Sequence, residues 1–174
     1  MNEQEEVIKF TELANFFPKQ KEALEASKRF KFVLFGGSVG SGKSRWLRWS
    51  MVYWLIKFFD RYKIRGIRAG LFCEDYVSLN DRHLTKVKYE FPAWLGAFNQ
   101  QKHEFTLAPE YGSGIIAFRN LAEPENYLSV EFAIQGIDEI NRNPKSVFDM
   151  LRSRLRWPGI KDVKFLAGCN PLGE

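Results

Sequence analysis

Short apolar runs alternate along this chain with longer segments in which apolar residues recur at helical spacing. Runs bounded by turn residues predict strands, and the clearest of them cover 30–35, 67–73, 132–139 and 163–167. Two further strands are expected at 104–107 and 115–118, because these segments lie on either side of a turn rich in glycine. The strand over 132–139 is unusual, since Gln135 and Gly136 interrupt its apolar run and two acids end it.

The segments between these strands predict four helices. The first begins at Pro18, and the others cover 43–59, 78–91 and 143–156. The second of them is apolar on nearly every side, so we expect it to be buried with its tryptophans in the core. His83 lies on the apolar face of the third, and its position favours a packing residue over a catalytic base. The last is expected to begin at Asn143-Pro144 and to carry Arg152, Arg154 and Arg156 on its final turns.

This alternation of strands and helices predicts an α/β fold with a mainly parallel central sheet and helices on both faces. In such folds the functional residues lie just beyond the carboxyl ends of the strands. Three polar segments of this chain follow that rule, because each comes directly after a predicted strand. They are the glycine-rich stretch 36–44, the acids at 138–139 and Asn170.

The stretch that follows the first strand reads Gly-x-x-x-x-Gly-Lys-Ser from Gly37, the pattern of a phosphate-binding P-loop. Its glycines permit a tight curl in which backbone N–H groups point at an anion. Lys43 is expected to reach the β- and γ-phosphates, and the Ser44 hydroxyl to ligate Mg²⁺. The nucleotide-binding residues predicted here are Gly37, Ser38, Val39, Gly40, Ser41, Gly42, Lys43 and Ser44.

The acids that end the later strand, Asp138 and Glu139, complement this loop. Asp138 is expected to hold Mg²⁺ through its water shell, and Glu139 to polarise the attacking water. An acidic pair at a strand end is often only a solvated turn, but its coupling to a P-loop favours the catalytic interpretation.

Composition excludes only a few classes of protein and cellular location. The 174 residues suit one domain, and the net charge of +5 is compatible with a nucleic-acid partner. The two cysteines, Cys73 and Cys169, have no metal-ligand spacing and suggest a reducing compartment. The longest apolar run is much shorter than the roughly 20 residues that span a bilayer, and the acidic start does not resemble a secretory leader, so we expect no membrane attachment.

Gln20 lies in the first predicted helix, on the face that carries Ala23, Leu24 and Ser27. Its amide offers a donor and an acceptor, which suits the edge of an adenine ring. The alternative is a glutamine that caps its own helix, and spacing alone favours the cap.

Taken together, these motifs resemble those of the ATPase domain of the large terminase subunit, the DNA-packaging motor of tailed bacteriophages. The resemblance extends from about Phe16 to Pro171 and rests on motifs in this order: Phe17-Pro18-Lys19-Gln20, Gly37 to Ser44, Asp138-Glu139, Arg154-Leu155 and Gly168-Cys169-Asn170-Pro171. It implies a P-loop NTPase of the ASCE type. It also implies that Gln20 contacts adenine, that Lys43, Asp138, Glu139 and Arg154 serve catalysis, and that Asn170 senses the γ-phosphate.

The resemblance further implies Mg²⁺-dependent ATP hydrolysis that drives double-stranded DNA into a procapsid. The implied partners are DNA, a portal protein and a small terminase subunit, with a homo-oligomeric ring on the portal. The expected location is the cytoplasm of an infected bacterial host, not the mature virion. Residues 1–174 would form the N-terminal ATPase domain, a piece that lacks the C-terminal nuclease domain and its activity.

Other P-loop enzymes are alternatives. A DNA-dependent ATPase of helicase or recombinase type would share the P-loop (Walker A motif) and the acid pair (Walker B motif), but it should carry further strand-contact motifs. A small-molecule kinase would need water excluded from its site and not activated, and the pair Asp138-Glu139 argues against it.

The source of a charge-neutralising arginine is left open by the sequence. Many large terminases have an arginine inside the P-loop, where this chain has Ser38-Val39. The remaining candidates are Arg119, Arg142, Arg152, Arg154 and Arg156.

Overall fold

The structure is a computed structural model that describes residue 10 and residues 12–171. Its centre is a seven-stranded sheet in the order β1-β7-β6-β2-β5-β4-β3. The strands are β1 (Phe32–Gly36), β2 (Arg68–Cys73), β3 (Gly96–Asn99), β4 (Glu104–Leu107), β5 (Ile115–Asn120), β6 (Ile134–Ile137) and β7 (Lys164–Cys169). Neighbours from β1 to β5 in this order are parallel, and β4 and β3 are added antiparallel at one edge.

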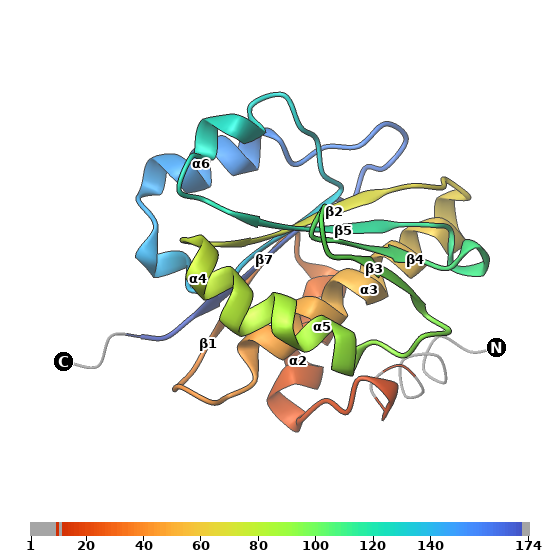
Figure 1. Ribbon diagram of the computed structural model, residues 1–174, viewed down its shortest axis with the longest axis horizontal. Coiled ribbons are helices and arrows are strands. Elements are labelled where there is room, and N and C mark those ends of the chain that lie inside the picture. The colour runs from red at the N-terminus through yellow and green to blue at the C-terminus, as the bar shows by residue number, and fades with distance from the viewer. Residues whose placement is uncertain (1–9, 11, 172–174) are drawn as a thin grey trace.

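Helices cover both faces of this sheet. They are α2 (Pro18–Arg29), α3 (Lys43–Tyr62), α4 (Tyr76–Leu79), α5 (Thr85–Glu90) and α6 (Lys145–Ser153). In the view of Figure 1, α2, α3 and α5 lie below the sheet and α6 lies above it. The predicted α/β class, with a mainly parallel sheet between helices, is confirmed. β7 lies between β1, which leads into the glycine-rich loop, and β6, which leads into the acids.

The core forms where apolar strands meet α3. All residues of β6 are buried, as are all but the first of β2, which is expected for parallel strands covered on both faces. Trp46, Trp49 and Trp54 of α3 are 0, 1 and 6% exposed. The prediction that this helix is buried, with its tryptophans in the core, is therefore confirmed.

The segment predicted as one helix over 78–91 is more complex. It begins at Tyr76, because the Asp75 side chain accepts a hydrogen bond from the Ser78 N–H at 2.7 Å. It then passes through a π-helical turn, Asn80–Leu84, before continuing as α5. β3, which pairs with β4, was not predicted at all.

The last predicted helix is too long. α6 ends at Ser153, so Arg154 and Arg156 do not lie on it. The chain leaves the helix because Arg154 O accepts a hydrogen bond from Phe132 N at 3.1 Å and Leu155 bridges to Phe132. At the other end Asn143 is not the cap, because Pro144 is the residue that precedes the first helical turn.

Candidate nucleotide-binding and hydrolysis site

Neighbouring parallel strands bring the three predicted polar segments together. β1, β7 and β6 are adjacent, so the P-loop, Asn170 and the acids all leave the sheet at the same edge. The P-loop, Asn170 and Glu139 line a cleft of about 440 Å³, and Asp138 is buried next to it, in contact with Ser44. The cleft is bounded by Val39, Gly40, Ser41, Gly42, Lys43, Ser44, Arg45, Arg82, Glu139, Arg142 and Asn170. Most of the predicted site residues thus lie in one place.

The P-loop takes its shape from two glycines with left-handed backbone angles. Gly40 has φ 82° and Gly42 has φ 77°, in a region that side chains disfavour. A Cβ on Gly42 would also lie only 2.4 Å from the Gln20 amide nitrogen. Lys43 follows as the first residue of α3, so the positive end of this long helix faces the cleft.

Lys43 lies at the centre of the polar contacts in this cleft. Its Nζ donates to Gly37 O and Ser38 O, both at 2.9 Å, to Ser41 Oγ at 3.1 Å and to Asn170 Oδ1 at 2.5 Å. An ammonium has three protons, so these acceptors already compete, and a phosphate oxygen could replace one of them without leaving Lys43 unpaired.

Ser44 and Asp138 are in direct contact. Ser44 Oγ donates to Asp138 Oδ2 at 2.6 Å, and Asp138 is 1% exposed. Burial alone would raise the pKa of Asp138, but hydrogen bonds from His83 and Ser44 outweigh it and hold the pKa at about 2. Asp138 Oδ1 is buried and has no hydrogen-bond partner among the described residues. An ionised carboxylate with a free oxygen, beside a hydroxyl, is a donor set that suits Mg²⁺.

Glu139 has φ 53°, a left-handed conformation that usually costs a residue with a side chain about 1–3 kcal/mol. Its Oε2 accepts a hydrogen bond from the backbone N–H of Asn170 at 3.1 Å. Since Asn170 also accepts from Lys43, this residue joins the P-loop to the second acid.

A histidine, His83, contacts Asp138 from inside the core, and the sequence did not predict this contact. His83 Nε2 is 3.0 Å from Asp138 Oδ2, and the residue is fully buried. It packs in the core as predicted, but it also contacts the site. No sequence spacing links it to Asp138, since the two residues meet only through the sheet order.

Cys73 lies close to the same pair, and its sulfur comes within 4.8 Å of the ligand atoms of His83 and Asp138. Burial, followed by the nearby Asp138 carboxylate, raises the pKa of the Cys73 thiol well above its usual value. A protonated thiol is a poor metal ligand, so this group favours buried packing over a metal centre.

Positive charge dominates the wall of the cleft opposite the P-loop. Arg82 and Arg142 both pair with Glu74 Oε1, at 2.8 and 3.0 Å, at the end of β2. Burial would raise the pKa of Glu74, but its hydrogen bonds, led by those from Arg82, outweigh this and lower it. These arginines and Lys43 make the cleft suitable for a polyphosphate.

Gln20 does not face the cleft. It is fully buried, its Oε1 accepts from Phe17 N at 2.8 Å, and its Nε2 donates to Gly42 O at 2.7 Å. These contacts are those of the helix-capping alternative, while the adenine contact that the resemblance implies stays a prediction. Its second bond additionally ties α2 to the P-loop.

Arg154 is separated from the cleft by the length of β6. Its backbone bonds to Phe132 at the amino end of that strand, whereas Asp138 follows the carboxyl end. A catalytic role for Arg154 in the site of its own chain is therefore not supported. Of the other candidate arginines, Arg142 alone lines the cleft as the described residues form it, since Arg119 bonds to Glu104 and Arg156 to Glu131.

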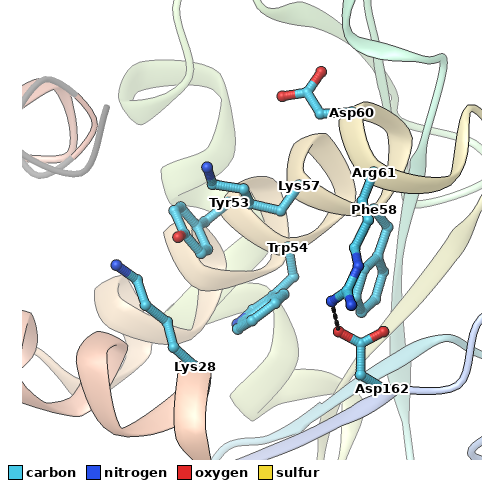
Figure 2. Close-up of a pocket in the computed structure, with 8 residues that line it drawn as sticks. All are labelled: Lys28, Tyr53, Trp54, Lys57, Phe58, Asp60, Arg61 and Asp162. Atoms are coloured by element: carbon cyan, nitrogen blue, oxygen red, sulfur yellow. Dashed lines mark hydrogen bonds and ion pairs between the residues drawn. The ribbon is translucent and has the colours of Figure 1, made fainter. Parts of the chain in front are cut away.

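A second hollow of about 660 Å³ lies at the far end of α3. Figure 2 shows its aromatic floor, with Tyr53 and Trp54, and its charged rim, where Arg61 pairs with Asp162 at 2.9 Å. It is larger than the P-loop cleft, but its lining mixes basic residues with Asp60 and Asp162, and no glycine-rich loop borders it. The P-loop cleft is the better candidate for a nucleotide.

Solved structures of other proteins share this fold. No family model matches the chain, and no curated protein matches it. Among solved structures, the large terminase of the thermophilic bacteriophage D6E in complex with ADP has a TM-score of 0.72 and 16% identity, over 90% of this chain and 39% of that chain. The same terminase has also been solved in complex with ATP-γ-S.

Two further terminases are similar. The large terminase ATPase domain of Thermus phage P74-26 has a TM-score of 0.60 and 19% identity, over 95% of this chain and 70% of that chain. The large terminase of bacteriophage HK97 has a TM-score of 0.65 and 8% identity, over 88% of this chain and 33% of that chain. The chain thus has the fold of large-terminase ATPase domains and spans about two fifths of the D6E protein, at 39%. In the part of the chain that the structure describes, no helix is long and apolar enough to cross a membrane.

Proposed function

We propose that this chain is the ATPase part of a phage large terminase subunit, which hydrolyses ATP with Mg²⁺ to move double-stranded DNA into a procapsid. The observation that carries this proposal is the set of hydrogen bonds within one cleft. Lys43 is joined to Asn170, Asn170 to Glu139, and Ser44 to Asp138. Each residue of the set has a defined task in phosphoryl transfer to water.

The P-loop would bind the triphosphate. Its backbone N–H groups and the amino end of α3 favour an anion, and Lys43 adds a positive charge. Ser44 and Asp138 would hold Mg²⁺, which would neutralise charge on the β- and γ-phosphates when bound.

Glu139 is proposed as the residue that orients the attacking water and accepts its proton. Its carboxylate lines the cleft, and the Asn170 N–H holds one of its oxygens. Because Asn170 touches both Lys43 and Glu139, it is suited to report the γ-phosphate to the water-activating acid.

Arg142 and Arg82 are the arginines that this cleft offers to the transferred phosphate. Both are held by Glu74, which fixes their guanidinium groups at the rim of the cleft. They can supply in cis the charge that the P-loop lacks. Arg154 stays a candidate only for the site of a neighbouring subunit in a ring.

The proposed partners are those of a packaging motor: DNA, a portal protein, a small terminase subunit and further copies of this chain in a ring. Fold likeness alone supports them. The proposed place of action is the cytoplasm of the infected host, with the chain absent from the mature virion.

Steady-state ATP hydrolysis by the purified chain, with and without duplex DNA, tests the proposal. Hydrolysis should require Mg²⁺ and be lost in Lys43→Ala, while the exposed-lysine control Lys86→Ala should match the parent chain. Unchanged turnover in Lys43→Ala would refute the nucleotide site. Unwinding of a forked duplex would favour a helicase, and a phosphorylated acceptor would favour a kinase.

A further inference from the structure

A buried polar chain lies behind Asp138 and connects three parts of the fold. His83 Nε2 contacts Asp138 Oδ2 at 3.0 Å, and Arg48 Nη1 contacts His83 Nδ1 at 3.1 Å. Arg48 in turn donates to both oxygens of Glu90, at 2.8 and 2.5 Å. His83 and Arg48 are 0 and 3% exposed, so solvent does not compete for these bonds.

Arg48 fixes the proton positions on the imidazole. A guanidinium has donors only, so His83 Nδ1 must act as the acceptor in its contact with Arg48. The remaining ring proton then lies on Nε2, which donates it to Asp138 Oδ2. The ring is therefore neutral, and it is the donor in its bond with the carboxylate.

The backbone around His83 supports this orientation. His83 belongs to the π-helical turn Asn80–Leu84, a type of turn that is rare and often found at functional sites. The carbonyl of Arg82 within it accepts a hydrogen bond from Arg48 Nη1 at 2.5 Å. Arg48 thus holds both the ring of His83 and the turn that carries it.

α3 contacts Asp138 from two directions. Ser44 donates to Oδ2 directly, and Arg48, one helical turn later, acts through His83 on the same oxygen. Asp138 Oδ2 therefore accepts two hydrogen bonds, while Asp138 Oδ1 has no hydrogen-bond partner among the described residues. This division leaves Oδ1 as the oxygen that can accept a hydrogen bond from metal-bound water.

We propose that His83 is a positioning residue, which holds the Asp138 carboxylate in the orientation that binds Mg²⁺ together with the nucleotide. The inference rests on the proposed function, because it assigns Mg²⁺ to Asp138 and Ser44. Residues that orient a metal-binding group commonly change metal affinity by about 10–100-fold when they are replaced.

The test measures binding rather than turnover. The affinity of the full chain for ATP-γ-S is determined by calorimetry with Mg²⁺ and with EDTA, for the parent chain, His83→Leu and His83→Gln. Leucine removes the donor, and the glutamine amide can supply a new one. His103→Gln is the matched control, since His103 is the other of the two histidines and lies in the β3–β4 turn.

In the parent chain Mg²⁺ should strengthen binding. In His83→Leu this metal-dependent gain should fall about 10–100-fold, while binding in EDTA stays within about twofold of the parent value. His83→Gln should recover most of the gain, and His103→Gln all of it. A folded His83→Leu with the full gain overturns the inference, as does a folded His83→Gln that is as weak as His83→Leu. A parent chain without any metal-dependent gain overturns the proposed function as well.

A second measurement does not depend on any variant. ¹⁵N NMR of the parent chain reports which nitrogen of each imidazole carries the proton. Nε2 of His83 should carry a proton, before and after addition of Mg²⁺ and ATP-γ-S. A His83 ring whose Nε2 carries no proton overturns the inference even if His83→Leu fails to fold.

Discussion

Replacing Glu139 by glutamine should separate ATP binding from ATP hydrolysis. The change keeps the size of the side chain, and the new amide oxygen can still accept the hydrogen bond that Asn170 N–H gives to Glu139 Oε2 at 3.1 Å. The contacts of Lys43 and Ser44 are not touched, so nucleotide affinity should stay within about twofold of the parent value, because neither contact involves the changed group.

Hydrolysis should fall much further, because an amide cannot take a proton from water. Loss of a general base lowers rates by about 10²–10⁴-fold, which corresponds to roughly 2.7–5.5 kcal/mol in the activation free energy. Single-turnover hydrolysis of radiolabelled ATP measures the rate, and displacement of a fluorescent nucleotide measures the affinity.

Asp138→Asn is the matched control, since it makes the same chemical change at the neighbouring position. Asp138 Oδ2 accepts from both Ser44 and His83, and an amide has one oxygen to offer them. Asp138→Asn should therefore weaken Mg²⁺-dependent nucleotide binding itself. If Glu139→Gln loses affinity while Asp138→Asn binds normally and turns over slowly, the two roles have been assigned the wrong way round.

Further outcomes follow from the same geometry. Gly42→Ala should destabilise the chain by about 1–2 kcal/mol in urea unfolding, because φ is 77° at this position. The new Cβ would also lie 2.4 Å from the Gln20 amide nitrogen, so adding Gln20→Ala to the same chain should reduce the loss of stability. Glu139→Gly should be more stable than Glu139→Ala by about 1 kcal/mol, because glycine tolerates the left-handed backbone, and equal unfolding free energies would contradict this strain. The low pKa of Asp138, about 2, should contribute stability that is complete above the unfolded-state pKa near 3.8 and is lost as pH falls toward 2. The loss is about 2 kcal/mol in total, and urea unfolding at pH 5 and pH 3 should show a smaller fall in Asp138→Asn than in the parent chain.

The P-loop and the acid pair could be predicted because each is contiguous in sequence. Their chemistry depends on residues that are neighbours along the chain, and the strands that deliver them are short apolar runs. The same holds for α3, because apolar residues lie on nearly every side of it and predict its burial without knowledge of distant partners.

Features that depend on distant partners could not be predicted. β3 reads Gly-Ala-Phe-Asn, which has little intrinsic strand preference, and it forms because β4 pairs with it. α6 ends at Ser153 because the chain turns to meet Phe132, not because a stop signal follows directly. The contact of His83 with the site could not be predicted, because its two polar partners, Arg48 and Asp138, lie far from it along the chain.

Gln135 and Gly136, the two residues that interrupt the apolar run of β6, explain how this strand fits between its helices. The side chain of Gln135 donates to Leu151 O of α6 at 2.8 Å, so the helix on that face is held by a buried polar contact. Gly136 faces α3, where a Cβ would lie 2.9 Å from Met51 Cε and 3.4 Å from Leu47 Cδ2. A larger residue would push α3 away from the sheet. Because Ser44 belongs to α3 and Asp138 follows β6, this close approach helps set their 2.6 Å contact, so the glycine serves the site from within the core.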